Sequence, residues 1–191
     1  MGKIISGNQG PVLGIETSSD MYEKLKFESD RLANGWGPYD AFNFLVTAWH
    51  LFQDWTKSDA PGSLNRAKRR RANLSESMNF VLDITRDLVN GSKHFLLDPN
   101  AVSKRKVKET HDGVDANWHS FFFHENMLGV TAQGTWYFSV RVLCNILLSY
   151  FSWVFDDSIS VKEFPHELNE AINYCNIGNR KNMSPPALWA L

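Results

Sequence analysis

The chain has 191 residues, of which 43% are hydrophobic and 13% aromatic, with seven Trp and thirteen Phe. This composition excludes an intrinsically disordered chain and predicts one domain with a well-filled core. The formal net charge of −1 excludes a global attraction to nucleic acid or membranes, so binding to a polyanion would depend on local patches.

The N-terminal part predicts an arm followed by two helices. Residues 1–19 are rich in Gly and Ser, which indicates a flexible arm without a signal peptide. Helical periodicity follows over residues 20–34, where Asp20 and Glu23 resemble a capping box. Pro38 is typical of a first helical turn, and the next helix continues to about residue 57.

The middle of the chain predicts a loop and a third helix. Residues 58–72 form the loop, and Asn73 and Glu76 are predicted to cap the helix that follows. This helix either ends at Asn90-Gly91, with a C-cap there, or continues through the glycine to Phe95. An interior glycine costs about 1 kcal/mol relative to alanine, which leaves both alternatives open.

A small antiparallel sheet is predicted after a polar loop at 98–115. Three short aromatic or β-branched segments are separated by turns, and they indicate a β insertion at about 118–138. A long helix at 139–155, a short helix at 165–175 and a tail at 177–191 complete the chain. We therefore predict a mostly helical α+β fold in which one domain, residues 20–176, contains a helical bundle and a small β-hairpin or sheet.

One apolar segment, residues 136–155, has about the length needed to cross a bilayer. Its polar residues Arg141, Asn145, Ser149 and Ser152 recur at helical spacing and form one stripe. This pattern favours a core helix with a narrow polar seam, so no membrane contact is predicted.

The two cysteines, Cys144 and Cys175, indicate buried free thiols in a reducing compartment, which predicts a cytoplasmic protein. A group of metal-ligand residue types also occurs in the chain. It is not predicted to bind a metal, because His119 and His124 would point to opposite faces of a strand. The group consists of His111, Asp112, Asp115, His119, His124 and Glu125. No motif for nucleotide or dinucleotide binding occurs, so no cofactor is predicted.

Two predicted helices carry polar stripes with identical spacing. The first stripe is Asn43, Thr47, His50 and Asp54, and the second is Asp83, Asp87, Asn90 and His94. Either both stripes face solvent, or the stripes meet in one polar network between packed helices. The network alternative contains His50, Asp54, Asp87, Asn90 and His94.

The sequences "NFLVTAWHLFQDW" and "RDLVNGSKHF" resemble a family of uncharacterised bacterial helical proteins over most of residues 38–155. More distantly, Arg86-Asp87 followed by His94 resembles the motif of HEPN-type ribonucleases, which are helical domains of toxin and antiviral-defence systems. The resemblance implies metal-independent RNA cleavage, usually by two protomers that pool their sites. It also implies that His94 is the general acid or base at the ribose 2′-hydroxyl, that Arg86 steadies charge on the phosphate, and that Asp87 orients the arginine.

The candidate catalytic set is therefore Arg86, Asp87, Asn90 and His94. Seven residues separate Arg86 from His94, slightly beyond the usual spacing of the motif. In a continuous helix the two would be about 12 Å apart in rise, so a break at Asn90-Gly91 or a partner protomer would be needed. Alternatively, the segment is only a helix end whose Lys93 and His94 interact with the negative end of the helix dipole.

Two basic runs flank this helix and predict salt-sensitive, non-specific contact with phosphate backbones, although solvated loops or an acidic protein partner are alternatives. Their basic residues are Arg66, Lys68, Arg69, Arg70, Arg71, Lys104, Arg105, Lys106 and Lys108. The sequence thus predicts a HEPN-like helical domain that binds or cleaves RNA, with a homodimer and a protein partner as further alternatives for its partners. The alternative is a non-catalytic protein-interaction or scaffold module.

Overall fold

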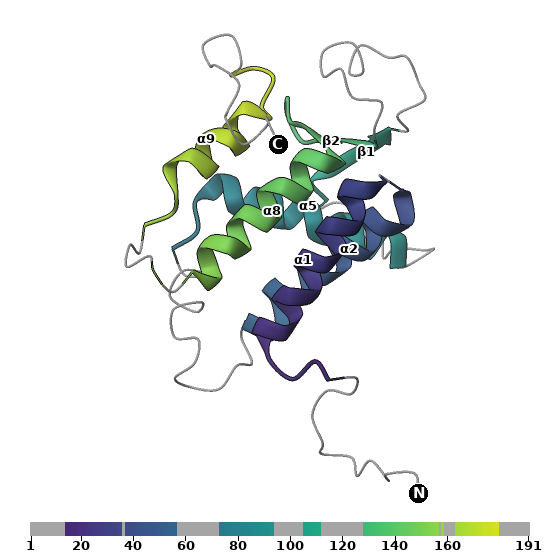
Figure 1. The fold of residues 1–191 in the computed structure, drawn as a ribbon. Helices are drawn as coiled ribbons and strands as arrows, with labels where there is room; N and C mark the ends of the chain where they lie inside the picture. Colours follow the sequence, from purple (N-terminus) through teal and green to yellow (C-terminus); the bar gives the residue numbers. More distant parts are fainter. Residues whose placement is uncertain are drawn as a thin grey trace, which may run out of the picture.

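The computed structural model describes residues 14–35, 37–56, 73–93, 105–111, 128–156, 158 and 163–179. It has the predicted mostly helical α+β fold (Figure 1). The α-helices are α1 (Ser18–Asn34), α2 (Pro38–His50), α5 (Glu76–Lys93), α8 (Val140–Phe155) and α9 (His166–Tyr174), with a π-helical turn η1 (Leu51–Trp55) after α2. The strands are β1 (Val107–His111), β2 (Gly129–Ala132) and β3 (Tyr137–Ser139).

Helix α1 begins two residues earlier than predicted because Thr17, not Asp20, is its N-cap. The Thr17 hydroxyl accepts a hydrogen bond from the Asp20 N–H at 3.2 Å, and the Asp20 carboxylate accepts one from the Thr17 N–H at 2.9 Å. The capping box predicted from Asp20 and Glu23 is therefore wrong. Asp20 occupies the third helical position, where its carboxylate satisfies the backbone of the cap.

Helix α5 is capped by Ser75, because its hydroxyl accepts from the Met78 N–H at 3.1 Å, so the predicted Asn73/Glu76 cap is wrong. The helix is continuous through Gly91 to Lys93, which is the longer of the two predicted alternatives. The predicted C-cap at Asn90-Gly91 is therefore wrong.

The sheet has the order β1-β2-β3 and is antiparallel throughout. Strand β1 lies in the segment 98–115, which the sequence predicted to be a loop, and that prediction is wrong for residues 107–111. The segment at 118–123, predicted to be a strand, lies outside the described residues. Gly134 has a φ of 76° in the turn between β2 and β3, a backbone conformation that favours glycine.

The outer edge of β3 is covered by the segment that follows α9. The Tyr137 N–H donates to the Cys175 carbonyl and the Ile177 N–H donates to the Thr135 carbonyl, each at 2.9 Å. Near this contact, the Ser77 hydroxyl at the start of α5 donates to the Asn173 side chain at 2.9 Å. These hydrogen bonds join β3 to the segment 175–177 and the start of α5 to the end of α9.

Helix α8 is the centre of the core and lies between α1 and α9 (Figure 1). Leu143, Ile146, Leu147 and Phe151 of α8 are completely buried, whereas Arg141, Asn145, Ser149 and Ser152 are not buried. The predicted core helix with a polar seam is therefore confirmed. Across the part of the chain that the structure describes, no helix combines the length and apolarity needed to span a membrane.

Candidate functional site

The site predicted from the HEPN-like motif begins with Arg86 on α5, which is held by two carboxylates. Its Nη1 donates to Asp83 at 2.7 Å, and its Nη2 and Nε donate to one oxygen of Asp87 at 3.0 and 3.2 Å. The Arg86 side chain is 34% exposed, whereas the Asp87 side chain is only 6% exposed. Asp87 therefore pairs with Arg86 on the side of α5 that packs against the rest of the domain.

The second oxygen of Asp87 attaches strand β1 to α5. It accepts hydrogen bonds from the Lys106 N–H at 2.5 Å and from the Val107 N–H at 3.4 Å. Buried backbone N–H groups need acceptors, and here a carboxylate from another element supplies one. The segment that the sequence predicted to be a loop is thus fixed at the start of β1.

One helical turn after Asp87, Gly91 lies on the same face of α5. A Cβ atom at Gly91 would be 3.1 Å from Nη2 of Arg105, so the glycine gives the guanidinium room to lie against the helix. The Arg105 carbonyl accepts from Nε2 of Gln133 at 2.9 Å, and the Gln133 N–H donates to the Lys106 carbonyl at 2.9 Å. Residues 105 and 106 are therefore held between α5 and the β2–β3 turn.

The structure brings together five of the predicted basic and catalytic residues on α5 or on the segment attached to it: Arg86, Asp87, Arg105, Lys106 and Lys108. Asn90 lies one turn after Arg86 and is half-buried. The other predicted residues, His94, Arg66, Lys68, Arg69, Arg70, Arg71 and Lys104, lie outside the described residues.

The first polar stripe makes a contact with α1. The buried Thr47 hydroxyl accepts from Nζ of Lys24 at 2.5 Å, and Lys24 also forms an ion pair with Glu28. His50 Nδ1 lies 2.8 Å from the Asp54 carboxylate, and both side chains are exposed. Asn43, at the start of the stripe, is exposed.

The network predicted between the stripes includes His94 and stays a prediction. The described contacts of Thr47 and Asp87 lead to α1 and β1 instead. The contact of Thr47 with Lys24, which also pairs with Glu28, was not predicted from the sequence. The i, i+4 spacing of Lys24 and Glu28 was the available signal, but spacing within one helix does not reveal which neighbouring helix the pair contacts.

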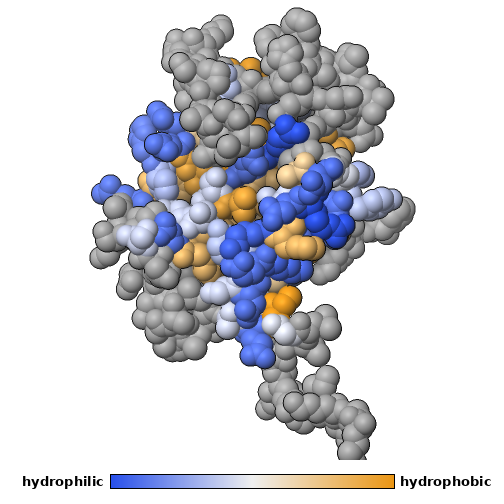
Figure 2. Space-filling model, viewed as in Figure 1, coloured by the Kyte–Doolittle hydropathy of each residue, from blue (hydrophilic) through white to orange (hydrophobic). Residues whose placement is uncertain are grey.

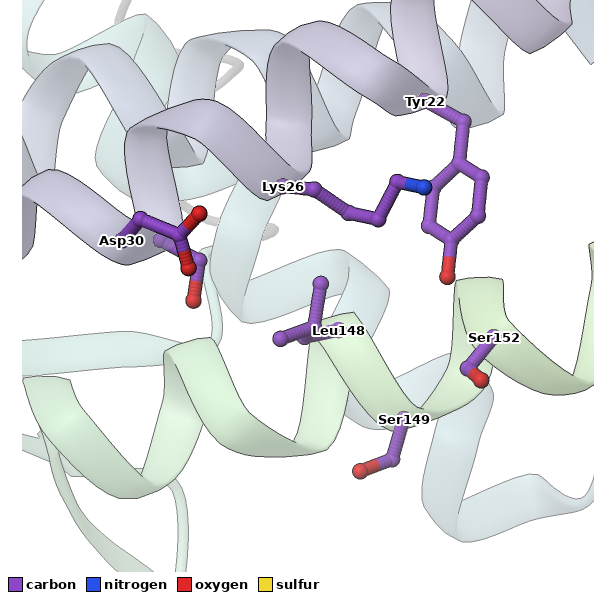
Figure 3. Close-up of a pocket in the computed structure, with 7 residues that line it drawn as sticks. Tyr22, Lys26, Asp30, Leu148, Ser149 and Ser152 are labelled. Carbon is purple, nitrogen blue, oxygen red and sulfur yellow. The ribbon is translucent and has the colours of Figure 1, made fainter.

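Two residues of the polar seam of α8, Ser149 and Ser152, line a surface groove. A cavity of about 370 Å³ lies between α1 and α8, and a second of about 270 Å³ lies between α8 and α9. Ser149 and Ser152 line both cavities. Figure 3 shows the first cavity, with Lys26 of α1 lying over the Tyr22 ring, 5.0 Å from its centroid. Figure 2 shows hydrophilic and hydrophobic surface mixed on this face of the molecule.

Neither thiol nor metal chemistry is supported by the described residues. Cys144 and Cys175 are free and buried, as predicted, and burial raises the pKa of the Cys144 thiol far above its ordinary value. Within the described ranges, no three His, Cys, Asp or Glu side chains are grouped so that they could hold a metal ion. Most of the candidate group at 111–125 lies outside these ranges.

Compared with protein families, curated proteins and solved structures, the chain matches none.

Proposed function

We propose that the chain is a HEPN-like helical domain that binds RNA through the end of α5 and the start of β1. The observation that supports this proposal is the Asp87 carboxylate, which holds Lys106 and Val107 on the helix beside Arg86. The sequence separates Arg86 and Lys106 by twenty positions, and this contact places the basic residues at the start of β1 beside Arg86.

Arg105, Lys106 and Lys108 supply the charge for phosphate contact, and their side chains are partly or fully exposed. Their contacts would follow the RNA backbone rather than the bases, so binding would be salt-dependent and tolerant of sequence. The basic run at 66–71 lies outside the described residues.

Cleavage by the HEPN-like pair would need two protomers. Because α5 is continuous from Arg86 to Lys93, the break in the helix that would bring Arg86 and His94 together in one chain does not occur. About 10 Å of helical rise separates Arg86 from Lys93, the last described residue of the helix. A homodimer that combines Arg86 of one protomer with His94 of the other fits this geometry, and a toxin or defence setting follows from the same resemblance.

The test combines binding and cleavage. Anisotropy of a labelled single-stranded RNA is measured for wild type and for a Lys106→Gln/Lys108→Gln double variant, and cleavage is measured in EDTA for wild type, His94→Ala and Arg86→Ala. Folding is checked by circular dichroism and the number of protomers by light scattering. We expect salt-sensitive binding that the double variant weakens. RNA binding that is absent, or unchanged in the double variant, would contradict the proposal.

The groove across α8 supports the second candidate function, a non-catalytic protein-interaction module. Two neighbouring cavities that share Ser149 and Ser152 provide a mixed polar and apolar surface, and no residue of α5 lines either of them. Ser152→Trp would fill the groove without changing the basic surface. A specific protein partner that binds wild type and not this variant, in the absence of RNA binding, would favour the module.

A further inference from the structure

Arg86 and Arg105 both lie against α5, but their electrostatic surroundings differ. Arg86 donates three hydrogen bonds to the carboxylates of Asp83 and Asp87. The two carboxylates carry more negative charge than the one guanidinium carries positive charge. A phosphate approaching Arg86 would therefore meet a pair of acidic groups and would have to compete with them for the same N–H donors.

Arg105 has no carboxylate partner among the described residues. Arg31 and Arg86, by contrast, each form ion pairs with aspartates. Its Nη2 is buried against Gly91 and has no hydrogen-bond acceptor within the described part of the chain. A guanidinium that is partly removed from water without an acceptor is costly. The negative end of α5 offsets only part of this cost, because a helix end carries about half an elementary charge.

The backbone at Arg105 is fixed although its side chain is not paired. Gln133 binds the Arg105 and Lys106 carbonyls, and Asp87 binds the Lys106 N–H. These bonds join α5, the start of β1 and the β2–β3 turn at one point. A change in the side-chain torsions of Arg105 would therefore turn its guanidinium toward a ligand without movement of the backbone. A backbone that is already fixed lowers the entropic cost of binding.

We propose that Arg105, rather than Arg86, is the described arginine of this basic surface that contacts a phosphate of bound RNA. This inference rests on the proposed function and deepens it, because it names the phosphate ligand within the basic surface. In binding, Arg86 is then a positioning residue: it holds Asp87, and Asp87 holds the segment that carries Arg105, whereas its proposed part in cleavage by two protomers is a separate role. The glycine at position 91 keeps the guanidinium close to the helix end.

The experiment compares the full-length wild-type chain with Arg105→Gln, Arg105→Lys, Arg86→Gln and Arg31→Gln. Arg31→Gln is the matched control, because it removes one positive charge from the partly exposed pair with Asp40 on α1 and α2. Binding of a short fluorescein-labelled oligouridine is measured by anisotropy over a range of salt. Stabilisation by inorganic pyrophosphate is measured from the midpoint of thermal unfolding.

We expect Arg105→Gln to lose about tenfold in RNA affinity and to lower the log–log salt slope by about one. Arg31→Gln should bind like wild type, and Arg105→Lys should be intermediate because lysine keeps the charge but loses the planar fork. Arg86→Gln should lower the unfolding midpoint, and the folded variant should lose less RNA affinity than Arg105→Gln.

Equal affinities of Arg105→Gln and Arg31→Gln would overturn the inference and leave the proposed function intact. A larger loss of affinity in folded Arg86→Gln than in Arg105→Gln would overturn it as well. If wild type binds no RNA, the proposed function fails, and stabilisation by pyrophosphate then tests whether Arg105 binds phosphate. Stabilisation of wild type but not of Arg105→Gln would support a phosphate site at Arg105, and no stabilisation of either would exclude it. If Arg105→Gln does not fold, Arg105→Lys replaces it in each comparison.

Discussion

Replacing Asp87 by alanine tests whether its carboxylate holds β1 on α5. The variant removes the acceptor of the Lys106 N–H at 2.5 Å and of two N–H groups of Arg86 at 3.0 and 3.2 Å. A buried donor left without an acceptor costs about 1–3 kcal/mol, so the amide and the half-buried guanidinium together give a loss of about 3 kcal/mol. For a chain of this size, such a loss corresponds to roughly 10 °C in Tm.

Asp83→Ala is the matched control, because it removes a carboxylate that binds the same arginine. The Asp83 and Arg86 side chains are 38% and 34% exposed, and the pair lies within one helix. Such a pair contributes about 0.2–0.5 kcal/mol. Asp83→Ala should therefore leave the free energy of unfolding almost unchanged.

Urea unfolding followed by circular dichroism measures both variants, with the m value as a check that the extent of unfolding is the same. Hydrogen exchange adds a local readout, since the Lys106 and Val107 amides should lose protection in Asp87→Ala. Equal stability of the Asp83 and Asp87 variants, with these amides still protected, would show that Asp87 does not anchor the strand.

Four further predictions concern other parts of the fold. Thr17→Ala should cost about 1 kcal/mol in urea unfolding. Hydrogen bonds with Glu16 and Thr17 hold the pKa of Asp20 below its ordinary value of 3.8. The stabilisation from ionised Asp20 is therefore present above pH 3.8 and is lost as the pH falls through the lowered pKa. Acid titration followed by circular dichroism would detect this loss. Gly129→Ala should lower the free energy of unfolding by about 1–3 kcal/mol in thermal unfolding. The new Cβ would lie 2.3 Å from the hydroxyl oxygen of the buried Tyr137. A stability equal to wild type would contradict this packing. The Cys144 thiol should react with a disulfide reagent only as fast as the protein unfolds, so rapid labelling of the native protein would refute its burial.

Helix α8 shows what a sequence pattern predicts well. Its long apolar run with a polar stripe predicted both the helix and the face that stays out of the core, because the burial of α8 follows directly from helical periodicity. The sequence did not show that Ser149 and Ser152 would line a groove, since that depends on how α1 and α9 pack on either side.

Strand β1 shows why part of the site was missed. Its sequence, "VKETH", has no apolar alternation and reads as a polar loop. The strand forms because β2 pairs with it on one side and Asp87 binds its first amides, and both partners are distant in the sequence. Tertiary contacts thus override the weak local preference of these residues.

The sequence predicted which residues belong to the candidate site but not the contacts between them. Arg86, Asp87 and the basic run at 104–108 were singled out separately, and the structure joins them through one carboxylate. Neither the place of Arg105 beside Gly91 nor the pairing of Thr47 with Lys24 follows from spacing along one helix. Such contacts are set by the packing of neighbouring elements.

The cover over β3 has a consequence for the order in which the chain is made. During synthesis, β3 and α8 leave the ribosome before residues 175–177, so the Tyr137 N–H and the Thr135 carbonyl have to wait for their partners. An uncovered strand edge of this kind pairs readily with other chains. Nascent chains on which α8 has emerged and residues 175–177 have not should therefore be the species that associate, and the emergence of these residues from the ribosome is the step that removes this risk.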